Sequence, residues 1–206
     1  MVNPSLERTN IIIVGKWNIS ILSPNWLGRH ILVNPKVNIE VPLTPGNPFR
    51  ITGDDIILVP EANRLVLQPA ALSVDNLIRA ESMAIRIMEQ LPHTPVSKFG
   101  INIGYDLTEI PDDFEQHFPF PDVNVFADNS LKLNARIYTW SFDYEDHILN
   151  LKSELSNKGA AIDFNFHHDC DGCEQAIQLL TGKCKKSLDK AKSLMSDAYG
   201  LSLEET

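Results

Sequence analysis

The chain has 206 residues, of which 43% are hydrophobic and 22% are charged, and its formal net charge at pH 7 is −9. This size and composition suffice for a hydrophobic core without disulfide or metal supports, and we expect one domain over residues 1–206. The negative charge argues against nucleic acid as a partner, because its phosphates are repelled by such a surface on average.

The sequence carries no sign of a membrane or secreted protein. Apolar runs such as residues 11–14 are only four residues long, far too short to cross a bilayer. The first residues lack the basic start and long apolar run of a signal peptide. The three cysteines, at positions 170, 173 and 184, are an odd number in one segment, unlike a disulfide framework. We expect a cytoplasmic protein with reduced thiols and no membrane partner.

The first elements are predicted to be strands interrupted by one helical turn. Residues 10–22 alternate apolar and polar side chains, as in a strand with one buried face. Ser23 and Pro24 then favour a helix start, because serine caps a helix and proline fits its first position. Residues 37–41 form a second alternating run, which Pro42 ends.

A hairpin and a helix follow. Residues 56–59 and 65–68 flank a turn-rich segment, which is typical of a β-hairpin. From Ser73, a good N-cap, apolar residues recur at helical spacing to about Leu91, and Pro92 ends the element. This segment is the central amphipathic helix of the predicted fold.

The strand predicted over residues 99–107 has one face of small and polar side chains. These are Gly100, Asn102, Gly104 and Asp106. Such a face suits either solvent, as in many antiparallel sheets, or the close approach of another backbone or a ligand. No phosphate-binding loop is present here, because the glycines lie inside a strand and do not precede a helix.

The next segments mix an irregular connection with further strands. Residues 108–130 predict a long connection with one helical turn near Phe114. Residues 133–143 alternate again, with four aromatic side chains on one parity: Tyr138, Trp140, Phe142 and Tyr144. That face is expected to lie in the core or in a subunit interface. Residues 148–155 fit a short helix or a strand, and we favour a strand that turns into another over 160–168.

The tail completes the predicted fold. Residues 172–199 predict a helix with a break at Thr181–Gly182, ended by Gly200. Strands follow one another through short turns more often than through helices, which favours antiparallel pairing. We therefore predict an α+β fold: a mostly antiparallel sheet with a central amphipathic helix and a C-terminal helix packed on one face.

The tail also carries a cluster of positive charge. Five lysines, at positions 183, 185, 186, 190 and 192, are accompanied by Asp189 alone. This cluster is either the solvent-facing side of a helix or a docking patch for an acidic partner. A second copy of this acidic protein is one such partner.

The densest reactive chemistry lies between Asp163 and Cys173. Cys170 and Cys173 form a Cys-x-x-Cys at a predicted strand–helix junction, where a helix N-terminus can stabilise a thiolate. Thiol–disulfide catalysis has weak support, because Asp169 and Asp171 surround the thiols with negative charge, which raises a thiol pKa. Too few residues remain after this helix for the further strands of a thioredoxin-like protein.

A metal site is the other reading of this segment. Strand parity predicts that His168 faces inward and His167 outward. His168, Cys170, Cys173 and Cys184 then form a candidate zinc site, provided that Cys184 folds back across the break at Gly182. The alternative is that the thiols are buried and behave as small hydrophobic groups.

The remaining sequence offers no catalytic motif. No Gly-x-Ser-x-Gly or His-Glu-x-x-His occurs, and acidic residues beside His117 and His147 are typical of surface hydrogen bonds. We therefore expect a non-enzymatic protein that binds another protein or itself, a homodimer being the natural form. The alternative is a zinc-binding or thiol-redox protein centred on Cys170 and Cys173.

Overall fold

The computed structural model describes residues 2–34, 36–42, 44, 48–111, 114–119, 122–157 and 159–201. Its strands are β1 (Val2–Gly15), β2 (Asn38–Glu40), β3 (Arg50–Gly53), β4 (Ile56–Glu61), β5 (Arg64–Pro69), β6 (Val96–Leu107), β7 (Ala135–Tyr144), β8 (His147–Ser156) and β9 (Gly159–Asp169). Its helices are α1 (Pro24–His30), α2 (Val74–Gln90), the 3-10 turn η1 (Phe114–His117), α3 (Val123–Asp128), α4 (Gly172–Leu180) and α5 (Lys183–Tyr199).

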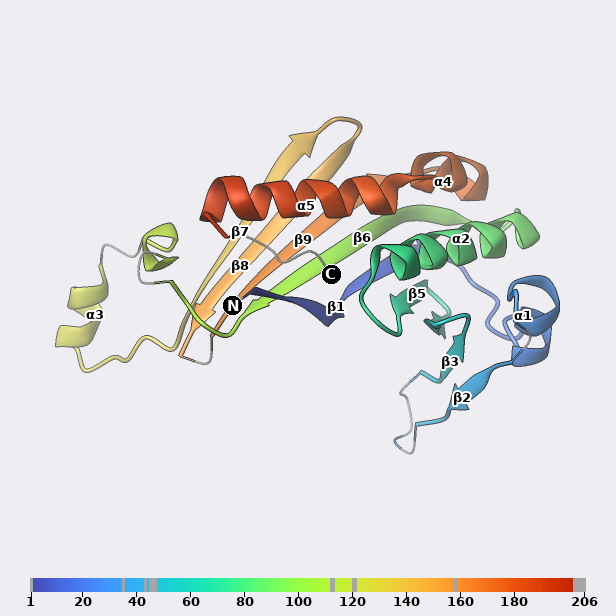
Figure 1. Ribbon diagram of the computed structural model, residues 1–206, viewed down its shortest axis with the longest axis horizontal. Helices are drawn as coiled ribbons and strands as arrows, with labels where there is room; N and C mark the ends of the chain where they lie inside the picture. The colour runs from blue at the N-terminus through green and yellow to red at the C-terminus, as the bar shows by residue number, and fades with distance from the viewer. Residues whose placement is uncertain are drawn as a thin grey trace.

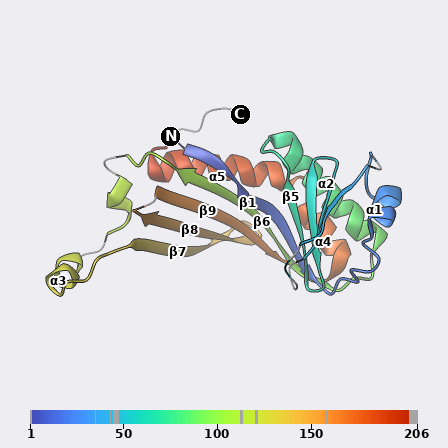
Figure 2. The same cartoon turned by 90° about the horizontal axis from the view of Figure 1, so that it is seen from below.

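The nine described strands form one antiparallel sheet, in the order β2-β3-β4-β5-β1-β6-β9-β8-β7. Helices α2, α4 and α5 lie along one face of this sheet (Figure 1). Figure 2 shows the opposite face of β1, β6, β9, β8 and β7, over which no described helix lies. This arrangement confirms the predicted α+β fold with helices packed on one face.

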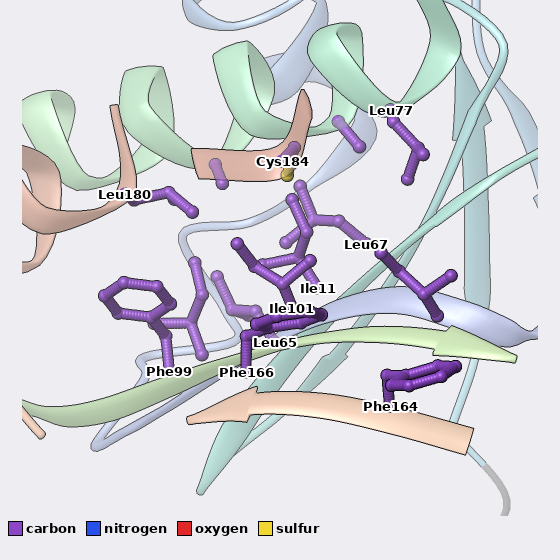
Figure 3. Close-up of a cluster of buried hydrophobic side chains, with 14 of the residues drawn as sticks. Ile11, Leu65, Leu67, Leu77, Phe99, Ile101, Phe164, Phe166, Leu180 and Cys184 are labelled. Atoms are coloured by element: carbon purple, nitrogen blue, oxygen red, sulfur yellow. The ribbon is translucent and has the colours of Figure 1, made fainter. Parts of the chain in front are cut away.

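The hydrophobic core lies between the sheet and these helices (Figure 3). Alternate residues of the central strands point into it, and Ile11, Ile101 and Phe164 are all fully buried. From α2, the predicted residues Leu77 and Met88 are buried against them, whereas Ile78, which the same spacing includes, is 40% exposed. Side chains repeat every two residues along a strand and every 3.6 residues along a helix, and both repeats place their apolar residues in this one layer.

The predicted helix ends are also observed. The Ser23 hydroxyl accepts a hydrogen bond from the Trp26 N–H at 3.3 Å, and the Ser73 hydroxyl accepts one from the Asn76 N–H at 3.1 Å. Gly182, with a φ of 71°, separates α4 from α5, and Gly200, with a φ of 64°, ends α5. Both glycines adopt left-handed backbone conformations that other residues reach only with strain.

Several boundaries differ from the sequence prediction. The first strand ends at Gly15, and the predicted extension to Leu22 is wrong, since the Trp17 N–H leaves the sheet to bond to Ala62. Ile19 and Ile21, which continue the alternation, are 40% and 36% exposed. Strand β3 and helix α3 were not predicted, whereas the ambiguous segment 148–155 is strand β8, as favoured.

The glycine-bearing face of β6 belongs to the open face of the sheet, on which Asn102 and Asp106 are partly exposed. A Cβ atom on Gly100 would lie 2.6 Å from Nδ2 of Asn165, and one on Gly104 would lie 2.5 Å from the Cβ of Arg8. The glycines thus make room for side chains from β9 and β1. The face therefore fits the solvent-facing interpretation, with side chains of neighbouring strands packed over its glycines.

A row of amides crosses the same open face of the sheet. Asn102 of β6 donates to Asn10 of β1 at 2.8 Å and accepts from Asn165 of β9 at 2.7 Å. Asn165 also accepts from Asn150 of β8 at 3.0 Å, and Asn150 accepts from Ser141 of β7 at 2.9 Å. These residues are direct cross-strand partners, so their side chains reinforce one register through five strands.

Candidate functional site

The four predicted zinc ligands are distributed over β9, the segment after it, α4 and α5. His168 lies near the end of β9 and is buried, while His167 is partly exposed, as the strand parity predicted. Cys170 follows β9, and its N–H bonds to the carbonyl of Ser97 at 3.0 Å. The Cys173 thiol, in the first turn of α4, lies 3.4 Å from the carbonyl oxygens of Leu91 and Thr94.

Cys184 occupies a different place from the other two cysteines. It lies in the core between α5 and the sheet (Figure 3), and its N–H bonds to the Glu81 carboxylate at 2.8 Å. Of the four predicted ligands, only His168 belongs to a group of three ligand atoms that the described residues bring together. The cysteine-centred zinc site stays a prediction, to be tested by metal binding.

The environment of the thiols keeps them protonated. Burial raises the pKa of Cys170 to about 11, with further contributions from Asp169, Cys173 and Asp171. Burial also raises the pKa of Cys173, and it raises that of Cys184 well above the ordinary value. Since the thiolate is the nucleophile, these three free thiols are poorly suited to redox chemistry at neutral pH.

A pair of stacked histidines is the most unusual polar feature of the core side of the sheet. Ile148 of β8 pairs with His167 of β9, so His147 and His168 are the next cross-strand neighbours. Their ring centroids lie 4.3 Å apart at an angle of 23°. Phe99 of β6 stacks on the other face of His168 at 4.6 Å. The imidazole of His168 is therefore enclosed between two rings.

A carboxylate and an ammonium group complete this cluster. Asp146, in the turn between β7 and β8, places Oδ1 3.1 Å from Nδ1 of His147 and 3.1 Å from Nζ of Lys183. The side chain of His147 is only 4% exposed, whereas that of Asp146 is 50% exposed. The cluster thus runs from buried His168 to the surface. Asp146, His147 and His168 are the one group of three potential metal ligands within 4.8 Å of one another that the described chain contains.

Sequence reasoning missed two of these three residues. His147 and Asp146 were interpreted as a surface pair because acidic residues surround them. The signal that could have identified His147 is its parity, which it shares with Leu149, a buried residue of the same strand. An inward-facing histidine at a strand start, beside the inward-facing His168, indicates a cluster.

The electrostatics of the cluster favour neutral imidazole and ionised carboxylate. Burial lowers the pKa of His168 to about 4, and the neighbouring His147 and Lys183 add to this effect. Hydrogen bonds from His147 and Lys183 lower the pKa of Asp146 to about 2. At neutral pH His168 is therefore a neutral imidazole and Asp146 an ionised carboxylate.

We expect acid to destabilise the protein between about pH 6.5 and pH 4. The pKa of His168 is about 4 in the folded state and 6.5 in the absence of perturbation, so the unfolded chain takes up the proton first. The free energy of unfolding therefore falls as the pH drops through this window, by about 2–3 kcal/mol in total.

Urea unfolding at a series of pH values, with a chelator present, measures this slope. His168→Phe retains a ring between Phe99 and His147 but removes the titrating group, so its slope is expected to be shallower. His93→Ala, at an exposed position, serves as the control and should retain the full slope. An unchanged slope in His168→Phe would contradict the assignment.

A pocket of about 300 Å³ gives the cluster access to solvent. It is lined by Tyr144, Glu145, His147, Phe166, Lys183, Lys186, Ser187, Asp189 and Lys190. The ammonium of Lys190 lies 5.1 Å from the centre of the Tyr144 ring, a cation–π contact. Water or a small ligand can thus reach His147 between α5 and the β7–β8 turn.

The second candidate surface is the edge strand β7. Its aromatic residues form a row, and the rings of Tyr138 and Trp140 stack at 5.5 Å. Tyr138 also contacts Phe118 and donates to the carbonyl of Pro119. Phe142 is 47% exposed, so the row is covered at one end and open at the other.

Comparison with known proteins adds no relative. The chain matches no protein-family model and no curated protein. Among the described helices, none combines the length and apolar character that a bilayer crossing requires. The function is therefore inferred from the geometry of the molecule.

Proposed function

We propose that this protein is a non-enzymatic binding protein that self-associates through the edge strand β7. The observation that carries the proposal is the character of this edge. β7 is ten residues long, pairs with β8 alone among the described strands, and has a continuous register without a bulge. A long, regular edge strand leaves backbone N–H and C=O groups available for another strand.

The side chains of this edge also favour contact with protein. Ile137 is 57% exposed on the open face of the sheet, and Phe142 is 47% exposed on the helix-bearing face. The strand contains no proline or lysine, which natural sheets use to protect edges. Apolar residues of α3 and of the segment that joins it to β7 are exposed as well: Val125, Phe126, Leu131 and Leu133.

A second copy of the chain is the occupant that best matches this surface. Two β7 strands related by a two-fold axis pair antiparallel, so the same surface serves both partners. The opposite edge, β2, is only three residues long and offers far less backbone.

We place this association in the cytoplasm. The three cysteines are free thiols, which suits a reducing compartment. A zinc-binding function centred on Cys170 and Cys173 remains the alternative, and it is distinguished from the present proposal by its dependence on metal.

The test is the oligomeric state measured by sedimentation equilibrium. The wild-type protein is expected to be a dimer, and the double variant Ile137→Lys with Phe142→Lys is expected to dimerise about 100-fold more weakly, because each copy then carries a lysine on each face of the pairing edge and lysines on an edge strand oppose strand pairing. The control is Ile39→Lys on β2, where Ile39 is 50% exposed. A clean wild-type monomer at high concentration, or dimer loss only in the control, would refute the proposal.

A further inference from the structure

The stacked pair His147 and His168 has buried ring nitrogens that lack hydrogen-bond partners. Within the described part of the chain, Nε2 of His147 and both ring nitrogens of His168 are buried without a hydrogen-bond partner. His168 is 2% exposed, and the His147 side chain is 4% exposed. Native structures rarely keep buried polar atoms unpaired, and a bound ion or water commonly explains them.

These ring nitrogens lie near the carboxylate of Asp146, and strand pairing holds the backbone of the two histidines. His147 begins β8, and His168 lies opposite it on β9, in a ladder that continues from Gly159 to His167. Tyr144 pairs with His147 and closes the turn that carries Asp146. One ligand atom from each of Asp146, His147 and His168 lies within 4.8 Å of the other two. Three ligand-bearing side chains thus converge from positions that the sheet holds in place.

We propose that Asp146, His147 and His168 bind one divalent transition-metal ion, with zinc as the best-matched ion. Two imidazole nitrogens and one carboxylate oxygen are a ligand set that zinc uses, leaving the fourth position for water or another ligand. The pocket beside His147 provides room for that fourth ligand. Tetrahedral zinc holds its ligand atoms roughly 3.3 Å apart, so binding draws the three side chains together.

Lys183 is the group that competes with the metal ion. Its ammonium lies 3.1 Å from Oδ1 of Asp146, the carboxylate that the ion needs. Two cations cannot share this oxygen without repulsion, so the ammonium moves into the adjoining pocket when the ion binds. Removing the charge with Lys183→Met is therefore expected to tighten metal binding about tenfold.

This site differs from the cysteine-centred one in all residues except His168. Calorimetric titration of the chelator-treated protein with zinc chloride is expected to show one ion per chain. His147→Phe and His168→Phe should each weaken binding by about 100-fold or more, because each removes a nitrogen ligand but keeps a ring in the stack. Cys170→Ser and Cys173→Ser, together with the exposed control His93→Ala, should leave the affinity unchanged.

Cobalt provides a readout that does not depend on affinity. Cobalt(II) bound by nitrogen and oxygen gives visible ligand-field bands without the near-ultraviolet thiolate-to-cobalt transition that cysteine ligands produce. Circular dichroism in chelator establishes that each variant folds. No zinc binding, a thiolate transition, or full binding by His168→Phe would overturn the proposal. The outcome is independent of dimerisation, since β7 variants retain all three ligands.

Discussion

The Phe99→Ala variant is expected to unfold with about 3–5 kcal/mol less free energy than the wild-type protein. Phe99 is 1% exposed on the central strand β6, and its ring stacks on His168 at 4.6 Å. Alanine leaves a cavity between the sheet and the helices, because neighbouring backbone in the sheet cannot collapse into it. Urea unfolding followed by far-ultraviolet circular dichroism measures the loss.

The same variant has a second expected effect, on the pKa of His168. Burial is the main reason that this pKa is lowered to about 4, and water entering the cavity relieves that burial. The pKa is therefore expected to rise toward 6.5, which an NMR titration of the imidazole detects. Val33→Ala, at an 81% exposed position outside β7, is the control and should change neither quantity appreciably. A destabilisation under about 1 kcal/mol would show that Phe99 does not hold the stack.

Replacing Glu81 with alanine is expected to lower the free energy of unfolding by about 2–4 kcal/mol. The Glu81 carboxylate, on α2, is 7% exposed and accepts hydrogen bonds from the backbone N–H groups of Gly182 and Cys184, both at 2.8 Å. These groups belong to the start of α5, where a negative charge also interacts favourably with the helix dipole. Alanine removes the partner of both donors, of which the Cys184 N–H is buried and cannot bond to water instead.

The control for this variant is Glu89→Ala, on the exposed side of the same helix. It removes an equal charge and should alter stability by less than about 0.5 kcal/mol. A further readout is the Cys184 thiol, whose pKa is raised by burial and by Glu81. That pKa is expected to fall in Glu81→Ala. Equal stability losses in the two variants would refute the capping role.

The sequence was a good guide wherever a periodic pattern coincided with burial. The helix from Ser73 and the strand containing Ile101 both have one apolar face, and both were predicted within a few residues. The same rule failed after Gly15, where Ile19 and Ile21 continue the alternation but lie in an exposed loop. The local pattern alone does not reveal where a strand ends, because the end depends on where the neighbouring strands stop offering hydrogen-bond partners.

The candidate sites were less predictable than the fold. The segment around Cys170 attracted attention because its reactive residues are close in sequence. The structure joins His168 instead to His147, which lies 21 positions earlier, through pairing of neighbouring strands. One member of the predicted lysine cluster, Lys183, likewise has a partner that the sequence did not indicate, because its ammonium forms an ion pair with Asp146. Spatial proximity in a sheet follows register, and register was not evident from residue types.

By itself, the sequence determined the α+β class and the apolar faces of the main helix and of the central strands, because these depend on short-range periodicity. It also determined that His168 faces inward, since side chains alternate along a strand. Only the tertiary structure decided the strand order, the exposure of edge β7, and the meeting of Asp146, His147 and His168. These features arise from long-range pairing, in which residues far apart in the chain become neighbours once apolar faces are buried together.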